Sequence, residues 1–410
     1  MPMNSELKPK IRFKGFTDDW EQRKLNEITD VRDGTHDSPK YIEYGHPFIT
    51  SKNIKNGFID YSDIQYISDA DFKEINKRSK VDINDILFGM IGTIGNIALI
   101  RENPTFAIKN VALVKDIHKI NYLYLYQYLQ SNNITKQFEE NVDGGTQKFI
   151  ALNKVRELII DYPQSDEQLK IGDFLEQIDN LITLHQRKCG KLVELKKSLL
   201  EKMFPQNNSV IPEIRFKGFN DDWEQCKYKD IGIPLSGGKL SYDSLDDDGD
   251  KKCVLYGDLY TKYDCIIQDI KNRTFEVGNS IIKNDILFPQ STTVDAYSLI
   301  SPACLNEENA ETSGVFVIRP YKNINGNFIC YYTKGNIEQR KKLSKKAQGL
   351  TIVHLYYHSI KEEFIMIPHK DEQDKIASVL LDLDNLITLH QRKHDKLNKI
   401  KQSLLNDMFV

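Results

Sequence analysis

The chain carries the same sequence frame twice. Residues 11–25 read IRFKGFTDDWEQRKL and residues 214–228 read IRFKGFNDDWEQCKY, so twelve of fifteen positions are identical at an offset of 203 residues (214 − 11). Residues 179–188 and 384–393 both read DNLITLHQRK, at an offset of 205 residues (384 − 179). The residues between the paired blocks share little. We therefore predict two similar halves, each of which encloses a variable insert within a fixed frame.

Length and charge narrow the class of protein. A chain of 410 residues is too long for one ordinary core, and about two to four domains are expected. The net charge of −3 does not support a free-standing nucleic-acid-binding protein, which usually has a basic excess. Either nucleic acid is not the target, or a partner supplies much of the charge that binds phosphate.

The cysteines and the N-terminal residues bear on the cellular compartment. None of the six cysteines lies in a CxxC pair, which predicts reduced thiols rather than a disulfide framework or a metal site. Residues 1–10 are polar and do not resemble a signal peptide. No apolar run approaches the roughly 18 residues of a membrane span. We expect a soluble, cytoplasmic protein.

Each half is predicted to end in one long helix. Ser165 and Gln168 have the spacing of a capping box, and Pro205 forbids continuation of a helix that should end near Phe204. The second helix is expected from about Asp371 to Phe409. Each helix would have about 39 residues and a length of roughly 58 Å, which suggests a coiled coil.

Apolar residues recur in heptads along both helices. Each seam also has a histidine and a lysine at mid-length, which we interpret as polar markers of register rather than as ligands. The favoured packing is antiparallel within one chain, and packing between two chains is the alternative. Leu175, Ile182 and Leu200 are expected on exposed helix faces that partners would cover. The predicted seam comprises Ile171, Phe174, Ile178, Leu181, His185, Lys188, Leu192, Leu195, Ile376, Val379, Leu383, Leu386, His390, Lys393, Leu397 and Ile400.

The two inserts are predicted to share a mixed fold. Residues 107–114, 157–162 and 314–319 have the composition of strands, and residues 122–132 are expected to form a helix with an aromatic face. The pentapeptide NDILF occurs at 84–88 and again at 284–288. The expected fold class is α/β (α+β), with two globular domains separated by two long α-helices packed as an antiparallel coiled coil, in a pseudo-twofold internal repeat. The predicted parts are a first domain (1–163), a first helical spacer (164–204), a linker (205–213), a second domain (214–368) and a second helical spacer (369–410).

The sequence lacks the common catalytic motifs. It has no GxxxxGK[ST] phosphate loop, no HExxH, no nucleophile elbow and no zinc-ligand spacing. The glycines Gly89, Gly92 and Gly95 are spaced GxxGxxG, which favours a tight turn over a nucleotide site. An aromatic-proline tetrapeptide typical of amino-methyltransferases is also missing. These observations predict a non-catalytic scaffold that bears no metal.

The duplicated frame resembles the specificity subunit of type I restriction-modification systems. The resemblance rests on the IRFxGFxDDWExxK start, the NDILF segment, the strand that ends in proline, and the DEQxKIxxxLxxxDxLIxLHQRK helix, each present twice. It covers both halves of the chain. It implies two target-recognition domains, each of which reads one half of a bipartite DNA sequence, and two conserved helices that set the spacer.

The resemblance also implies partners that perform the catalysis. Two methyltransferase subunits would bring S-adenosylmethionine, and restriction subunits would bring ATP-driven translocation and cleavage with Mg²⁺, so this chain itself would bind no cofactor. The target would be double-stranded DNA, protected by adenine methylation and cleaved when foreign. Partners that share the phosphate contacts would explain the negative net charge.

Candidate DNA-binding residues follow from polar loops in the inserts, because base edges are read by hydrogen-bonding side chains. In the first insert the DGTHDSPKY segment (33–41) resembles a segment common in this family, and the GGTQK segment (144–148) has a counterpart there too. In the second insert these segments have no direct match, so residues are chosen by position, and the divergence predicts an asymmetric target. The candidates are Thr35, His36, Ser38, Lys40, Tyr41, Thr93, Asn96, Lys109, Asn110, Thr146, Gln147 and Lys148 in the first insert, and Lys239, Ser241, Tyr242, Gln290, Ser291, Thr292, Thr293, Lys345, Lys346, Gln348 and Thr351 in the second.

Two alternative functions remain open from the sequence. A protein-interaction adaptor with two domains on a coiled-coil scaffold would show the same periodicity. An enzyme with its own nuclease or methyltransferase centre is disfavoured by the missing motifs.

Overall fold

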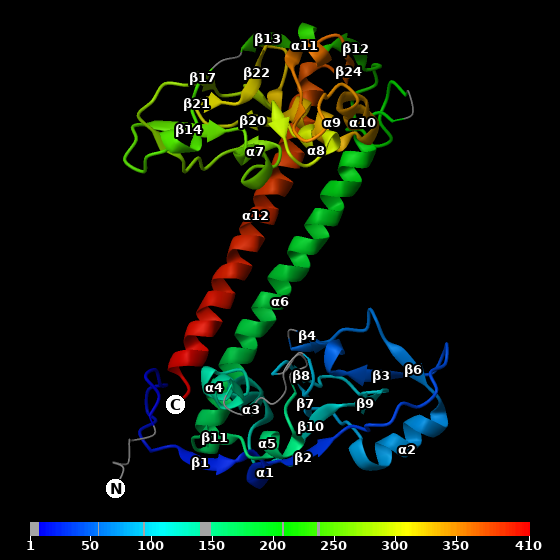
Figure 1. Ribbon diagram of the computed structural model, residues 1–410, viewed down its shortest axis with the longest axis vertical. Helices are drawn as coiled ribbons and strands as arrows, with labels where there is room; N and C mark the ends of the chain where they lie inside the picture. The colour runs from blue at the N-terminus through cyan, green and yellow to red at the C-terminus, as the bar shows by residue number, and fades with distance from the viewer. Residues whose placement is uncertain (1–7, 56, 93–94, 140–148, 207–208, 236–237) are drawn as a thin grey trace. The chain divides into compact units, whose positions relative to one another are not determined.

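The chain divides into two compact units, each built from a globular part and from portions of two long helices (Figure 1). The computed structural model describes residues 8–55, 57–92, 95–139, 149–206, 209–235 and 238–410. The first unit comprises Met1–His185 and Arg392–Val410, and the second comprises Gln186–Gln391. The long helices are α6 (Ser165–Lys202) and α12 (Lys370–Asp407), which end close to the predicted limits. The predicted domain boundaries themselves stay predictions.

In the first unit, a four-stranded antiparallel sheet (order β2-β10-β7-β8) lies beside a three-stranded sheet (order β6-β3-β9). Side chains alternate across the four-stranded sheet, so Ile86 and Phe88 face one core cluster and Leu87 faces another. Both faces of this sheet are therefore buried. The elements are β1 (Glu21–Lys24), α1 (Leu25–Ile28), β2 (Asp30–Asp33), β3 (His46–Thr50), β4 (Ile54–Lys55), β5 (Phe58–Ile59), β6 (Gln65–Ile67), α2 (Asp69–Ser79), β7 (Ile86–Gly89), β8 (Ile97–Leu99), β9 (Ala107–Lys109), β10 (Val111–Lys115), α3 (Tyr122–Tyr128), α4 (Asn132–Glu139), α5 (Leu152–Arg156) and β11 (Ile159–Tyr162).

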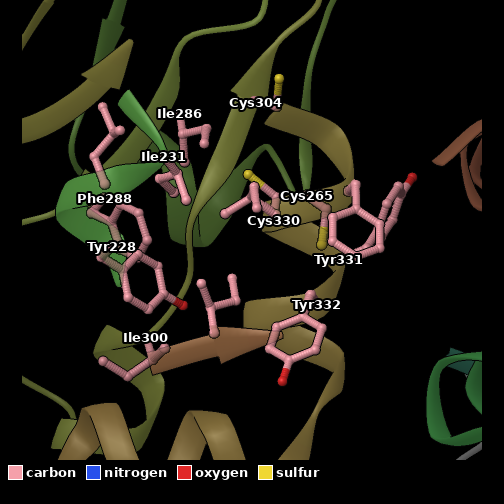
Figure 2. Close-up of a cluster of buried hydrophobic side chains, with 14 of the residues drawn as sticks. Tyr228, Ile231, Cys265, Ile286, Phe288, Ile300, Cys304, Cys330, Tyr331 and Tyr332 are labelled. Atoms are coloured by element: carbon pink, nitrogen blue, oxygen red, sulfur yellow. The ribbon is translucent and has the colours of Figure 1, made fainter. Parts of the chain in front are cut away.

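The second unit has a five-stranded sheet (order β13-β22-β18-β20-β15) and a four-stranded sheet (order β16-β14-β21-β17). Figure 2 shows how side chains of β18, β20 and α9 converge in its core. The elements are β12 (Glu224–Lys227), β13 (Gly232–Leu235), β14 (Lys251–Leu255), α7 (Asp258–Thr261), β15 (Ile266–Ile267), β16 (Arg273–Thr274), β17 (Asn279–Ile282), β18 (Ile286–Pro289), β19 (Ser291–Thr292), α8 (Ala296–Leu299), β20 (Ala303–Leu305), β21 (Asn309–Ser313), β22 (Val315–Pro320), α9 (Gly326–Gly335), α10 (Ile337–Ser344), β23 (Val353–His354), α11 (Tyr357–Ile360) and β24 (Phe364–Ile367).

The repeated NDILF segment forms the same turn and strand in both units. Asn84 and Asn284 have φ values of 71° and 78°, in the left-handed region that asparagine tolerates better than most residues. The next residue is a buried aspartate in each case. Asp85 accepts a hydrogen bond from Lys115 at 2.6 Å, and Asp285 accepts one from Arg319 at 2.7 Å. The pentapeptide is thus a turn with a buried anion, followed by a core strand.

Two predicted elements of the first unit are interrupted. Residues 107–114 form two strands in two different sheets, because Asn110 adopts a φ of 52° between β9 and β10. Residues 122–132 do not form one helix, since α3 ends at Tyr128 and α4 begins at Asn132. The aromatic face of α3 is confirmed by Tyr124 and Tyr128, whose side chains are fully buried.

Within each unit, the start of one long helix packs in the antiparallel direction on the end of the other, as the ion pairs Asp179–Lys401 and Asp384–Lys196 show. The C-terminal ends of the two helices are buried in the globular cores: Phe409 packs on Trp20 in the first unit, and Phe204 packs on Trp223 in the second. Each unit therefore contains the start of one long helix and the end of the other.

The proposed capping box at Ser165 is replaced by a different contact. Gln168 donates to the carbonyl of Pro163 at 2.8 Å and accepts from the backbone N–H of Asn121 at 2.9 Å. Gln373 repeats this arrangement with Pro368 and Asn325, both at 2.9 Å. Each glutamine amide therefore ties the residue that follows the preceding strand to the loop before α3 or α9.

The predicted seam residues differ in burial. Ile171, Ile178, Ile376 and Leu383 are buried, whereas a second group is 37–47% exposed. Leu175 was expected on an exposed face but is fully buried, because the globular part of the first unit covers that side of α6. This second group comprises Phe174, Leu181, Leu195, Leu386 and Ile400. Of the other predicted seam residues, Lys188 and Lys393 are exposed, and the half-buried ones are Leu192, Val379, His185, His390 and Leu397.

Candidate nucleic-acid interface

In the first unit, the loop after β2 is joined to the residues between β9 and β10. The backbone N–H of Thr35 donates to the carbonyl of Ile108 at 3.1 Å, and that of Asn110 donates to the carbonyl of Thr35 at 3.1 Å. A side chain at Gly34 would place its Cβ 2.4 Å from the Ile108 carbonyl oxygen, so only glycine permits this approach. Residues far apart in the sequence are therefore held together at one sheet edge.

Side chains of this edge form a polar cluster at the surface. The Nδ1 atom of His36 lies 2.7 Å from Asn110 Oδ1, and its Nε2 atom lies 2.9 Å from Asp33 Oδ2. Lys109 also donates to the hydroxyl of Ser38. The His36 side chain is 64% exposed, so the cluster is ordered by mutual contacts and is still accessible. We call Thr35, His36, Ser38, Lys109 and Asn110 the first polar cluster.

Two residues of this site were missed from the sequence. The carboxylate of Asp33 binds both His36 and the guanidinium of Arg78, which projects from α2. A cavity of about 500 Å³ between the loop and α2 is lined by Thr35 and Ser38 on one side and by Arg78 on the other. Arg78 had no sequence signal because four strands, β3 to β6, separate its helix from the loop along the chain.

Other candidates of the first insert lie apart from this cluster. Asn96 donates to the carbonyl of Ile54 at 3.0 Å and so contacts β4 instead. Tyr41 is exposed beside Phe48, and Lys40 is exposed. Thr93, Thr146, Gln147 and Lys148 lie outside the described residues.

In the second unit, the structure joins two groups of candidates through a short strand pair. Ser291 and Thr292 form β19, which pairs with β23. Gln348 and His354 exchange backbone hydrogen bonds of 2.9 and 2.7 Å. The segment from Gln290 is thereby held beside Gln348, although about sixty residues separate them in the sequence (348 − 290).

Aromatic residues connect this strand pair with the loop that contains Tyr242. The Tyr242 hydroxyl lies against Gly257, and the Tyr256 ring lies against Gly314. The carbonyl of Gly314 accepts a hydrogen bond from Gln290 N–H at 3.2 Å. Burial, with nearby Asp258 and Tyr256, raises the pKa of Tyr242, so its hydroxyl stays protonated and available as a donor.

The remaining candidates of the second insert are at the surface. Thr293, Thr351, Lys239 and Ser241 are exposed, as is Lys345. Lys346 lies 2.6 Å from Glu363, which also binds Lys342. Burial opposes ionisation of Glu363, but the hydrogen bonds from both lysines prevail and lower its pKa. Tyr256 and His354 were missed from the sequence, because their neighbours are brought close only by the fold.

Within the described ranges, no group of three or more histidine, cysteine, aspartate or glutamate side chains is placed to hold a metal ion. No helix in the same ranges is long and apolar enough to cross a membrane. The two surfaces consist of hydrogen-bonding and aromatic groups with nearby cations. Such groups can bind phosphates and read the edges of bases.

Comparisons with known proteins identify the fold and the family. Residues 17–194 and 220–399 each match the type I restriction modification DNA specificity domain. The chain is 25% identical, over 97% of its length and 94% of the relative, to a putative type I restriction enzyme MjaX specificity subunit of Methanocaldococcus jannaschii. It is 24% identical, over 95% of its length and 92% of the relative, to the type I restriction enzyme MjaVIII specificity subunit of the same organism.

A solved structure has the same fold. The S subunit of a type I restriction-modification system from M. genitalium aligns with a TM-score of 0.68 at 15% identity, over 98% of this chain and 99% of that one. Each half of the chain matches the family model once. The chain therefore belongs to the type I restriction-modification DNA specificity family, as a DNA-recognition subunit.

Proposed function

We propose that each globular part reads one half of an asymmetric, bipartite DNA target, and that α6 and α12 set the length of the unread spacer. The duplicated frame with two different surfaces supports this proposal most strongly. Asn110 and Gly314 occupy equivalent places before β10 and β22, with φ values of 52° and 72°, yet only Asn110 provides a side chain for recognition. Equivalent backbones with different side chains should recognise different base sequences.

We propose further that the chain is not itself catalytic and acts in the cytoplasm. Two methyltransferase subunits would bind its helices and supply S-adenosylmethionine, and restriction subunits would supply ATP- and Mg²⁺-dependent cleavage. The exposed apolar residues on α6 and α12, such as Leu195 and Leu386, support a partner surface along the helices. Cations of the partners would add to the phosphate contacts of a chain with net charge −3.

Methylation mapping tests the recognition proposal. The chain is co-expressed with methyltransferase subunits of its own system, and host DNA is sequenced by a method that detects modified adenines. We expect one asymmetric bipartite motif that is methylated only when this chain is present. A complex that assembles normally but methylates no defined motif would contradict the proposal.

A test of the proposed spacer role requires insertions in both long helices. Asp179 and Asp384 pair with Lys401 and Lys196 across the helices, so an insertion in α6 alone would break this register. Seven residues added to each helix, within 186–190 and 391–395, would lengthen both by roughly 10.5 Å. We expect the same two half-sites with a spacer longer by about three base pairs. An unchanged spacer in an active variant would rule out the role of the helices as a ruler.

A further inference from the structure

An apolar and aromatic stripe lies along one edge of the second unit. Residues 350–352 form the bend of a hairpin turn, and the chain then enters the short strand β23 (Val353–His354), where neighbouring side chains face opposite sides. Val353 and Leu355 are buried in the core, whereas Leu350 is 100% exposed, Ile352 49% and Tyr356 38%. We call Leu350, Ile352, His354 and Tyr356 the outer stripe.

The loop that presents Leu350 is firmly closed. Gln348 and His354 hydrogen-bond to each other through both backbone groups, and β19 pairs with β23 on the other side. Gly349 has a φ of 112°, and a Cβ there would lie 2.0 Å from the Ile352 carbonyl oxygen, so the tight turn requires glycine. Leu350 is therefore held away from the core at the tip of an ordered loop.

The other end of the stripe is a stack of rings. His354 and Tyr356 have ring centroids 6.0 Å apart and an interplanar angle of 11°. Tyr356 continues the stack to His358, at 5.4 Å and 9°. Parallel exposed rings provide flat apolar surfaces at a low cost in conformational entropy, as nucleic-acid-binding proteins use for sugars and bases.

The surroundings of the stripe favour DNA as its ligand. The exposed Lys345 precedes the loop beside Lys346, which pairs with Glu363, and Ser291 with Gln348 supplies hydrogen-bonding groups on the same strand pair. Basic residues beside an apolar tip match the layout of proteins that insert an aliphatic side chain between base pairs while cations hold the phosphates.

We propose that Leu350 is a wedge that enters the base stack of the second half-site and unstacks one base step, with Ile352 and the rings packed along the groove. This inference rests on the proposed function, since it assumes that the second unit reads its own half-site. An inserted side chain favours a flexible pyrimidine–purine step, because such steps unstack most readily. Leu350 would then select sequence without a hydrogen bond to any base.

Fluorescence of 2-aminopurine tests the wedge in the whole complex with methyltransferase subunits. The probe is placed at successive positions of the mapped second half-site, where unstacking raises its emission. We expect a bright step with the unaltered complex that disappears in Leu350→Ala, at saturating protein, while Leu350→Phe retains it. The affinity of Leu350→Ala for the duplex should fall on the order of tenfold or more.

Ile282→Ala is the matched control, because Ile282 is also an exposed aliphatic residue but lies on β17, outside the stripe. It should change neither the emission nor the affinity. The emission of a probe at the methylated adenine serves as an internal reference, since a base extruded by the methyltransferase would be bright in every variant.

Two results would overturn the wedge. If Leu350→Ala keeps the bright step and the affinity, the side chain does not enter the stack. If Leu350→Ala weakens assembly with the methyltransferase subunits and leaves DNA unstacking intact, the stripe contacts a protein instead. If the methylation map lacks a second half-site, the proposed function itself is wrong. If the map has one but the 2-aminopurine signal does not depend on Leu350, only the wedge is wrong.

Discussion

Lys401 Nζ lies 2.7 Å from Asp179 Oδ1, which joins the end of α12 to α6 within the first unit. The second unit has the same ion pair with the helices exchanged, because Lys196 lies 2.6 Å from Asp384. Each aspartate also accepts a hydrogen bond from the globular part, from Gln127 or from Tyr331. In each unit, the aspartate thus joins both long helices to the globular part, and the two ion pairs occupy equivalent positions in the repeat.

Removal of the Lys401 charge should destabilise the first unit. Lys401 and Asp179 are only 9% and 18% exposed, so Lys401→Met would leave a poorly solvated carboxylate, at a cost of about 2–4 kcal/mol. Urea unfolding followed by the fluorescence of Trp20, in a Trp223→Phe background, measures this change. Lys399→Met is the control, since Lys399 is exposed on the same helix. Equal midpoints for the two variants would show that the ion pair is not important for stability.

The C-terminal phenylalanines should stabilise one unit each. The ring centroid of Phe409 lies 5.2 Å from that of Tyr128 and 5.6 Å from that of Tyr124. Phe409→Ala would leave a cavity and lower the stability of the first unit by about 3–5 kcal/mol. The Trp20 transition should shift and the Trp223 transition should not, whereas Phe204→Ala should do the reverse.

The two tryptophans are the only ones in the sequence, so single-tryptophan variants separate the units. Phe58→Ala provides a control for the first unit, because Phe58 is 44% exposed. A Phe409→Ala variant that shifts both transitions equally would mean that the units unfold together.

The first polar cluster should determine which bases are recognised in the first half-site and should not affect the second half-site. His36→Ala removes a ring that contacts both Asn110 and Asp33, and should relax discrimination at one or two base pairs by about 1–3 kcal/mol each. Asn110→Gly removes the side chain and keeps the left-handed backbone. Methylation of a randomised DNA library should show changes in the first half-site and none in the second. Changes confined to the second half-site would contradict the assignment.

Thiol reactivity should follow burial and pKa. Cys253, Cys265, Cys304 and Cys330 are buried, and burial raises the pKa of Cys253 to about 12. A raised pKa lowers the thiolate fraction at a given pH, and the thiolate is the reactive species. A disulfide reagent at pH 7 should therefore modify only Cys189 rapidly.

Cys226 is half-buried, and burial also raises its pKa to about 12. Its reaction should be slow at pH 7 and accelerate about tenfold per pH unit below that pKa, while the protein stays folded. Mass spectrometry of Cys189→Ser identifies the site. Rapid modification of Cys226 at pH 7 would show a lower pKa than its surroundings indicate.

Much of the architecture could be predicted because its signals are local. The proline at 205 and the heptad pattern located the first long helix, and duplication of the frame located the second. The break at Asn110 could not be predicted, since a left-handed residue within an apolar run has no periodic signature. The exposure of Leu195 and the burial of Leu175 depend on which side of α6 the globular part covers.

In the candidate sites too, some residues could be predicted from the local sequence and others could not. The loop around His36 was found from its polar composition, but its partners Asp33 and Arg78 and the stack of His354 on Tyr356 were not. For the first unit, Thr93 and residues 146–148 stay predictions outside the described ranges.

By itself, the sequence determined that the chain is an internal repeat with two long helices and two divergent inserts, because duplication, helix breakers and heptads are properties of neighbouring residues. Only the tertiary structure decided which ends meet. Phe409 is buried beside Trp20 and Lys401 binds Asp179, although hundreds of residues separate the members of each pair. Such contacts depend on the packing of whole elements, which no local pattern encodes.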